Sequence, residues 1–197
     1  LINLIFILSP IILVFRFLKK KEDPVRFKEK LGFFDKKKKT GKLIWFHGAS
    51  VGEIQSIVPI LEKLEKNNSV KQILVTSNTL SSSKVLKINK FNKVIHQFFP
   101  IDTNFLTKKF INYWKPNLAI FIDSEIWPAM FKTIENKKIP LILLNARITR
   151  KTFERWIKFK NFSYSIFKRI SFAFPQNKET QFFLKKLKMK NLKFIGN

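Results

Sequence analysis

The sequence, 197 residues long, predicts an α/β fold built on a doubly wound, parallel sheet. One observation is a series of short apolar runs, rich in Ile, Val and Phe, which have the continuous hydrophobicity of strands buried on both faces. The other is that segments with apolar residues at helical spacing separate these runs, as helices separate the strands of a parallel sheet. This alternation predicts one Rossmann-like domain over residues 43–197.

The apolar runs predicted to be strands are residues 43–47, 72–77, 94–99, 118–123, 141–146, 172–175 and 193–196. The helical patterns between them cover residues 51–64, 105–114, 150–170 and 178–188. Binding sites in doubly wound sheets gather at the carboxyl ends of the strands. The residues that follow each strand are therefore the candidates for function.

The chain begins with an almost wholly apolar segment, residues 1–15, which is followed by Arg16, Lys19, Lys20 and Lys21. This segment is shorter than the ~20 residues that a spanning helix needs, and Pro10 interrupts it. We expect residues 1–18 to form a membrane anchor that spans or lies on the bilayer, followed by a basic linker over residues 19–42. The basic residues would place the rest of the chain on the cytoplasmic side. A cleaved signal peptide and a buried core helix are the alternatives.

The composition excludes some functions and favours others. There is no Cys, and the two His are far apart in the sequence, so thiolate chemistry is excluded and no metal site is predicted. The net charge of +26 suits a polyanionic partner, such as nucleic acid, an anionic membrane or a phosphorylated substrate. A bias toward Lys, Ile, Asn and Phe, as in proteins from AT-rich genomes, explains much of this charge equally well.

A tight turn with two glycines, HGASVGE, joins the first strand to its helix over residues 47–53. It lacks the Gly-Lys-Ser/Thr of a phosphate loop and the Gly-x-Gly-x-x-Gly of a dinucleotide-binding turn, although its glycines allow a ligand to approach closely. The spacing of Ser50 and Glu53 is that of a capping box, in which Ser50 caps the helix and Glu53 reaches back. Spacing alone favours a cap for Glu53, with a catalytic carboxylate as the alternative.

Polar residues also follow other strands. Thr76 and Ser77 could hold a phosphate or a sugar, or serve as ordinary turn residues. Asp102 is predicted to cap the helix that follows it. Glu125 lies at a helix entry, where it is either a catalytic carboxylate or a complement to the helix dipole. Arg147 is a natural anion ligand, and a structural ion pair fits it equally well.

Several motifs occur in an order that resembles the amino-terminal half of the 3-deoxy-D-manno-octulosonic acid (Kdo) transferases, which are lipid A glycosyltransferases. They are RFKEKLG (26–32), WFHGASVGE (45–53), FPID (99–102), SEIWPAM (124–130), NARIT (145–149) and the closing FIGN. The resemblance covers nearly the whole chain. One departure is Ala129, where the family usually has Asn.

The resemblance implies the amino-terminal half of a GT-B glycosyltransferase, which needs no cofactor and takes CMP-Kdo as its donor. This half binds the acceptor, a lipid A precursor, at the cytoplasmic face of the inner membrane, and the carboxyl-terminal half binds the donor. By motif position, Glu53 matches the general base of an inverting transfer, and Glu125 matches a glutamate that stabilises the transition state. The residues then expected to contact substrate are Ser50, Gly52, Thr76, Ser77 and Arg147. Without its donor half, this chain alone is expected to be inactive.

Two other classes of function stay open. The basic charge and the many aromatic residues would suit a domain that binds nucleic acid by stacking its bases. That reading leaves the apolar N-terminus unexplained, so nucleic acid is not the predicted partner. A non-catalytic domain that binds membrane lipids is the other alternative.

Overall fold

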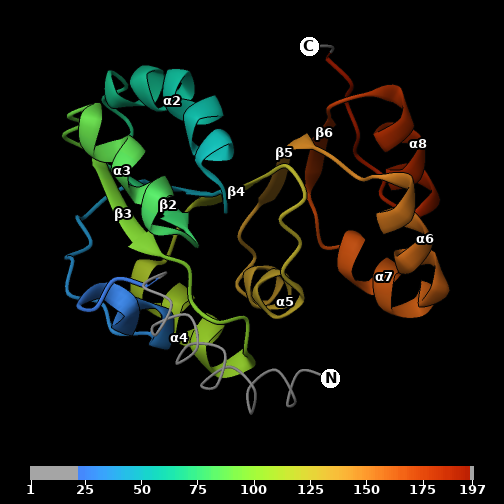
Figure 1. Cartoon of the computed structure of the whole chain (residues 1–197), viewed down its shortest axis with the longest axis horizontal. Coiled ribbons are helices and arrows are strands. Elements are labelled where there is room, and N and C mark those ends of the chain that lie inside the picture. Colours follow the sequence, from blue (N-terminus) through green and yellow to red (C-terminus); the bar gives the residue numbers. More distant parts are fainter. Residues whose placement is uncertain (1–21, 196–197) are drawn as a thin grey trace.

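A computed structural model describes residues 22–195, so the predicted membrane anchor at residues 1–18 lies outside the described residues. Between residues 22 and 195, no helix has both the length and the apolar character needed to cross a membrane. The described chain forms a six-stranded parallel sheet with helices packed around it (Figure 1). The predicted α/β class and the parallel sheet are thereby confirmed.

The sheet has the strand order β3-β2-β1-β4-β5-β6, and all neighbouring strands are parallel. The strands are β1 (Leu43–His47), β2 (Gln72–Ser77), β3 (Val94–Phe98), β4 (Leu118–Ile122), β5 (Leu141–Ala146) and β6 (Phe172–Pro175). The chain winds outward from β1 to β3, returns to the middle, and winds outward again from β4 to β6. The winding therefore reverses between β1 and β4, and the carboxyl ends of strands at such a point are where doubly wound sheets bind ligands.

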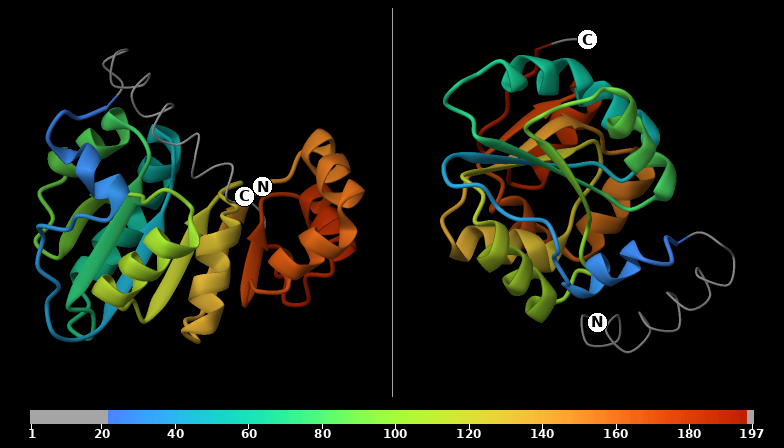
Figure 2. Two further views of the ribbon diagram at one scale, coloured as in Figure 1. Left: turned by 90° about the horizontal axis from the view of Figure 1, so that it is seen from below. Right: turned by 90° about the vertical axis from the view of Figure 1, so that its left-hand side faces the viewer.

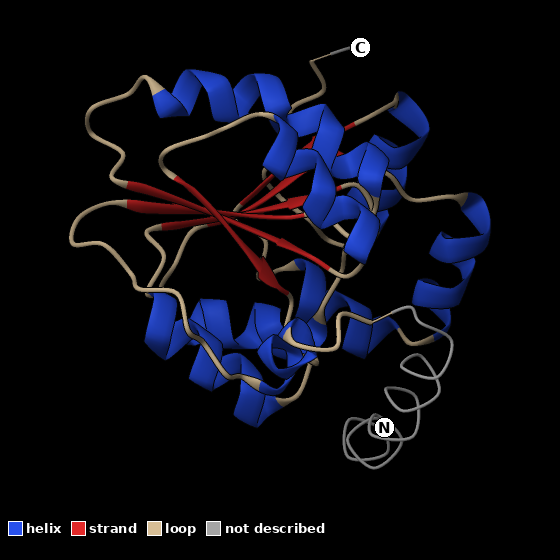
Figure 3. Ribbon diagram, turned by 60° about the vertical axis from the view of Figure 1, so that its left-hand side comes forward, coloured by secondary structure: helices blue, strands red, loops and turns tan. Residues whose placement is uncertain are grey.

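Helices cover both faces of the sheet (Figure 2, Figure 3). The helices α2 (Val51–Glu65) and α3 (Leu80–Ile88) pack on one face, and α4 (Asn104–Trp114) and α5 (Pro128–Asn136) pack on the other. The remaining helices, grouped toward the β6 side, are α6 (Arg150–Lys158), α7 (Lys160–Phe167) and α8 (Lys178–Lys186). The helical stretch predicted over residues 150–170 is thus broken, because the backbone of Phe159 leaves the helical conformation at φ −117° and ψ 58°.

Two apolar clusters form the core, one on each face of the sheet. Trp45 and Phe121 point toward α4 and α5, whereas Phe46 and Ile122 point toward α2 and α3. Alternate residues of a strand face opposite sides of the sheet. Since both sides are covered, every residue of β1 is buried. This is why the central strands read as continuous apolar runs.

The predicted seventh strand, residues 193–196, is wrong in its described part, residues 193–195. The structure has only an isolated bridge between Leu192 and Ala173. Ala173 N–H donates to Asn191 O at 2.9 Å, and Lys193 N–H donates to Ala173 O at 3.1 Å. The next bond of a parallel ladder would come from the N–H of residue 175, and Pro175 has none.

Part of the predicted basic linker is ordered against the edge of the sheet. Within it, the 3-10 helix η1 (Arg26–Leu31) lies beside β3. The buried carboxylate of Glu29 accepts a hydrogen bond from Phe98 N–H at 2.7 Å and is held by the Arg26 guanidinium. β3 is an edge strand, whose outward N–H groups would otherwise lack partners. The RFKEKLG motif therefore covers an exposed edge of the sheet.

Candidate active site

Glu53 lies in the first turn of α2, directly after β1. Its backbone N–H donates to Ser50 Oγ at 3.2 Å, and the Ser50 hydroxyl donates to Glu53 Oε1 at 2.7 Å. Its other carboxylate oxygen, Oε2, accepts the N–H of Ala49 at 2.8 Å. The predicted cap is confirmed with one difference. In a standard capping box the carboxylate reaches the N–H of the cap residue itself, and here it reaches the preceding residue.

Burial raises the pKa of Glu53 above its ordinary value of 4.5. Hydrogen bonds from Ser50 and Ala49 lower the pKa in part, because they stabilise the anion, whereas the charges of Glu125 and Asp123 raise it. A carboxylate with a raised pKa holds a proton more strongly than an exposed one does. That property suits a group that must remove a proton from a substrate.

The two glycines of the turn before Glu53 lie in opposite surroundings. A Cβ atom on Gly48 would lie 3.1 Å from Glu53 Cβ and 3.3 Å from Ile122 Cδ1, so these neighbours would have to shift to admit a side chain. A Cβ atom on Gly52 would meet no atom within 4 Å. The surface at Gly52, which precedes Glu53 in the first turn of the helix, is therefore open.

Glu125 follows β4 and points toward the end of β1. Its Oε2 lies 3.2 Å from His47 Nε2 and accepts a hydrogen bond from Trp127 Nε1–H at 2.9 Å. Its side chain is 16% exposed, so it remains accessible. The fold brings Glu125 and Glu53 to the same edge of the sheet, close enough for the charge of Glu125 to raise the pKa of Glu53.

His47 is the candidate functional residue that sequence reasoning missed. It ends β1, it is completely buried, and its ring stacks on Phe99 with 3.9 Å between the ring centroids. Its Nδ1 lies 2.9 Å from Thr76 Oγ1, and its Nε2 faces Glu125. The sequence contained a signal, since a polar residue ends an otherwise apolar strand. Only the tertiary structure shows which carboxylate it meets.

Asp123 directly follows β4 and Asn145 is the next-to-last residue of β5, and both have left-handed backbones, at φ 59° and φ 51°. Asp and Asn adopt this conformation more readily than other side chains do. Burial raises the pKa of Asp123, and the nearby charge of Arg147 lowers it in part. Arg147 is exposed, and its N–H donates to Asp123 O at 3.3 Å. The predicted anion ligand therefore lies at the same edge as the glutamates, and its binding role stays a prediction.

Thr76 and Ser77, predicted to contact substrate, are completely buried at the end of β2. Thr76 Oγ1 accepts the indole N–H of Trp45 at 2.9 Å and also bonds with His47. Ser77 Oγ bonds with His96 Nε2 at 2.8 Å. Both hydroxyls are thus engaged inside the protein, where they support their neighbours. Direct contact with a substrate stays a prediction for both.

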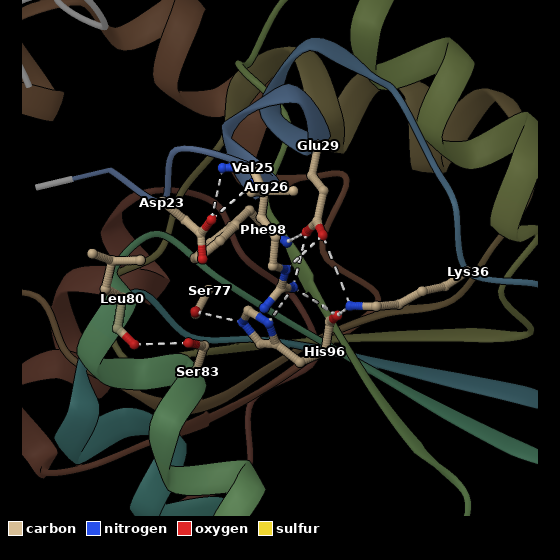
Figure 4. Close-up of polar contacts among 10 residues, drawn as sticks. All are labelled: Asp23, Val25, Arg26, Glu29, Lys36, Ser77, Leu80, Ser83, His96 and Phe98. Carbon is tan, nitrogen blue, oxygen red and sulfur yellow. Dashed lines mark hydrogen bonds and ion pairs between the residues drawn. The ribbon is translucent and has the colours of Figure 1, made fainter. Parts of the chain in front are cut away.

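Figure 4 shows the network to which Ser77 belongs. Arg26 binds Glu29 through Nε and Nη2, at 2.7 and 3.0 Å, and its Nη2 lies 2.8 Å from His96 Nδ1. A guanidinium can only donate, so Nδ1 of His96 accepts, and Nε2 carries the ring proton and donates to Ser77 Oγ. The network fastens η1 to β2 and β3.

Asp102 caps a different helix from the predicted one. Its carboxylate accepts the N–H groups of Ala129 at 3.0 Å and Met130 at 2.8 Å, in the first turn of α5. Thr103 caps α4, which directly follows it. The cap of α5 comes from another segment because Trp127, at the N-cap position, has no side-chain acceptor for these amides. Asp102 thereby fixes the helix start that carries Trp127.

Within residues 22–195, no group of three or more His, Cys, Asp or Glu side chains is arranged to hold a metal ion. The ionisable groups that meet at the reversal point are Glu53, Asp123, Glu125, His47 and Arg147.

A family model described as 3-deoxy-D-manno-octulosonic-acid transferase (kdotransferase) matches residues 25–197. The 3-deoxy-D-manno-octulosonic acid transferase of Rickettsia bellii is 38% identical over 195 residues, which are 98% of this chain and 46% of that protein. The one of Rickettsia felis is 43% identical over 131 residues, 66% of this chain and 28% of that protein. The one of Haemophilus influenzae is 28% identical over 179 residues, 89% and 42% of the two chains. The chain thus spans less than half the length of these relatives. Because the family model covers nearly all of it, the chain belongs to the Kdo transferase family, as its motifs predict.

Proposed function

We propose that the chain is the acceptor-binding half of an inverting GT-B glycosyltransferase that transfers Kdo from CMP-Kdo to a lipid A precursor. The observation that supports it is the convergence of Glu53 and Glu125 at the reversal point of the sheet, where doubly wound folds bind ligands. Membership of the Kdo transferase family supports the sugar that is transferred. The donor, CMP-Kdo, is proposed to bind in a carboxyl-terminal half that faces this edge, and no cofactor is required.

In the proposed reaction, Glu53 accepts the proton of an acceptor hydroxyl. The oxygen attacks the anomeric carbon of Kdo while the bond to the CMP phosphate breaks, and attack from the opposite face inverts the configuration. The acceptor is proposed to approach over the open surface at Gly52, the residue before Glu53. The bonds from Ser50 and Ala49 hold the carboxylate in place before the acceptor arrives.

Glu125 is proposed to stabilise the positive charge that develops on the anomeric carbon as CMP leaves. A fixed carboxylate does this without reorganisation at the moment of reaction, and Glu125 is fixed by His47 and Trp127. Exposed Arg147 at the same edge supplies a cation for a phosphate of the lipid acceptor.

The proposed acceptor is a lipid, so we also propose contact with the anionic cytoplasmic face of the inner membrane. The corner between α6 and α7 offers a surface of the required kind. Phe159 and Phe162 are 69% and 50% exposed there, and the exposed Lys158 and Lys160 flank Phe159. Aromatic residues that enter the interface together with lysines that meet anionic headgroups are typical of peripheral membrane attachment.

Flotation with vesicles that contain an anionic phospholipid tests this surface. The double variant Phe159→Ser, Phe162→Ser should bind the vesicles more weakly than the unchanged protein does. The matched control is Phe105→Ser, which removes a 70% exposed phenylalanine from α4. Equal loss in both proteins, or no loss in the double variant, would show that the α6–α7 corner is not the attachment site.

The proposed base is tested by Glu53→Gln in a protein that carries this chain together with a donor half. Kdo transfer to a lipid A precursor should fall by about 10²- to 10⁴-fold, the usual contribution of a general base. The control is Glu62→Gln, an exposed glutamate on the same helix, which should leave transfer unchanged. Near-normal turnover of Glu53→Gln would make the base assignment wrong. A much lower melting temperature with transfer retained would show that Glu53 is mainly a cap.

A further inference from the structure

Two nitrogen atoms lie within hydrogen-bond distance of a single oxygen of Glu125. The indole N–H of Trp127 donates to Oε2 at 2.9 Å, and His47 Nε2 lies 3.2 Å from the same atom. Within the described residues, Oε1 has no hydrogen-bond partner, and it is absent from the buried polar atoms that lack one. One oxygen is therefore held from inside the protein, and the other stays accessible from the site.

From this geometry we propose that His47 is a positioning residue, which holds the Glu125 carboxylate through Nε2–H so that Oε1 faces the substrate. The inference rests on the proposed role of Glu125 in transfer. His47 itself is completely buried and lies behind the carboxylate, so it acts through Glu125.

The partners on the other side of the ring agree with a proton on Nε2. The indole N–H of Trp45 can only donate, so Thr76 Oγ1 accepts from it at 2.9 Å. The Thr76 hydroxyl proton is then free to point at His47 Nδ1, 2.9 Å away, which is nearer than the alternative acceptor, Phe46 O, at 3.3 Å. With Nδ1 accepting, a neutral imidazole carries its proton on Nε2 and presents it to Glu125.

The surroundings of His47 fix the orientation of its ring. The ring stacks on Phe99 at 3.9 Å between centroids, and Phe121 and Trp127 lie at 5.0 and 5.9 Å. A ring enclosed in this way has no room to rotate away from the carboxylate. Positioning groups of this kind are effective because their own rotamers are locked by packing.

The arrangement also gives Glu125 and Glu53 different surroundings, which suit different roles in the proposed reaction. The indole N–H of Trp127 and, in the tautomer inferred above, Nε2–H of His47 hold the Glu125 carboxylate from one side. The charge of Glu125 is one cause of the raised pKa of Glu53. Carboxylates whose environments differ in this way take different roles, one as a fixed charge and the other as the proton acceptor.

One test is the tautomer of His47, measured by ¹⁵N NMR of the imidazole rings. The chain has only two histidines, and His47→Phe assigns their signals. We expect Nε2 of His47 to be protonated and Nδ1 to be unprotonated. Glu125→Gln should shift the Nε2–H signal of His47 more than it shifts the signal of His96. A bare Nε2, or an Nε2–H signal that Glu125→Gln leaves unchanged, would overturn the proposal whatever the activity.

The second test is transfer by a protein that carries this chain together with a donor half. His47→Phe keeps the stacked ring and removes both nitrogens, and we expect kcat to fall by about 10- to 100-fold, the value of a hydrogen bond to a charged group. The KM for the acceptor should change little. His47→Gln, whose amide can still donate to Glu125, should recover part of the loss, and it serves as the second variant if His47→Phe folds poorly.

The same assay separates this proposal from the one on which it rests. In a Glu125→Gln background, His47→Phe should cost much less than it does alone, because the carboxylate that it positions is gone. If Glu125→Gln is inactive but His47→Phe is folded and fully active, the positioning role is overturned and the proposed function stands. If Glu125→Gln keeps normal turnover, the proposed role of Glu125 is overturned, and the NMR result decides whether His47 holds its carboxylate.

Discussion

Ser50 and Glu53 bind each other in both directions across the first turn of α2. The Glu53 amide donates to the Ser50 hydroxyl at 3.2 Å, and that hydroxyl donates to the Glu53 carboxylate at 2.7 Å. Capping and catalysis are therefore compatible roles for one residue. The bonds that complete the helix start are also bonds that hold the carboxylate in place.

Replacement of Ser50 by alanine should affect stability and activity together. Loss of the cap should lower the free energy of unfolding by about 0.5–2 kcal/mol, measured by urea denaturation. The pKa of Glu53 should rise further, because the Ser50 hydrogen bond lowers it, so the acid limb of kcat/KM moves to higher pH. Ser50→Thr keeps the hydroxyl and is the control. An unchanged acid limb in Ser50→Ala would contradict the link between the cap and the base.

Gly52 provides a test in which binding and stability should move in different directions. A leucine there enters open space and replaces glycine within a helix, so stability should be unchanged or rise by up to about 1 kcal/mol. The same side chain would cover the approach to Glu53, and the acceptor KM should rise about tenfold or more. The contrast is Gly48→Ala, which should destabilise the fold by about 1 kcal/mol or more because Glu53 and Ile122 crowd its Cβ. Normal acceptor kinetics in Gly52→Leu would place the acceptor elsewhere.

The pH dependence of transfer should report the raised pKa of Glu53. Burial raises this pKa above 4.5, and a base works only when it is deprotonated, so kcat/KM should fall with acidification along a limb above pH 4.5. Asp123→Asn removes one charge that raises this pKa, and the limb should move to lower pH. Asn tolerates the positive φ at this position, so the backbone is kept. The control is Asp35→Asn, a change at an exposed position in the loop before β1. If Asp123→Asn leaves the acid limb of kcat/KM unchanged, the ionisation that this limb reports belongs to a group other than Glu53.

Removal of the Asp102 carboxylate should weaken the start of α5. Asp102→Ala leaves the amides of Ala129 and Met130 without their acceptor, and the free energy of unfolding should fall by about 1–2 kcal/mol. Asp102→Asn keeps one acceptor oxygen and should lose less. Turnover should also drop, since the loosened helix start carries Trp127, which holds Glu125. Full stability in Asp102→Ala, measured by urea denaturation, would mean that the two hydrogen bonds contribute little.

Much of the fold followed from local patterns. The continuous apolar runs predicted six of the strands because both faces of this sheet are covered by helices, so nearly every strand residue must be apolar. The capping interaction of Ser50 was predictable because it joins residues three positions apart. The seventh predicted strand failed because pairing depends on the partner strand. Residues 193–195 contain strand-forming side chains, and whether they pair depends on the N–H groups that β6 offers, which their own sequence does not encode.

The sequence by itself determined the class of fold, the helix cap that holds Glu53 and, through its ordered motifs, the Kdo transferase family. Each of these depends on neighbouring residues or on their order along the chain. The tertiary structure decided which helix Asp102 caps, that Thr76 and Ser77 are buried, and that His47 stands behind Glu125. His47 and Glu125 are 78 positions apart, and they meet because β1 and β4 are paired in the middle of the sheet, where the winding reverses. Strand order arises from packing of the whole chain, so no local pattern could have shown that contact.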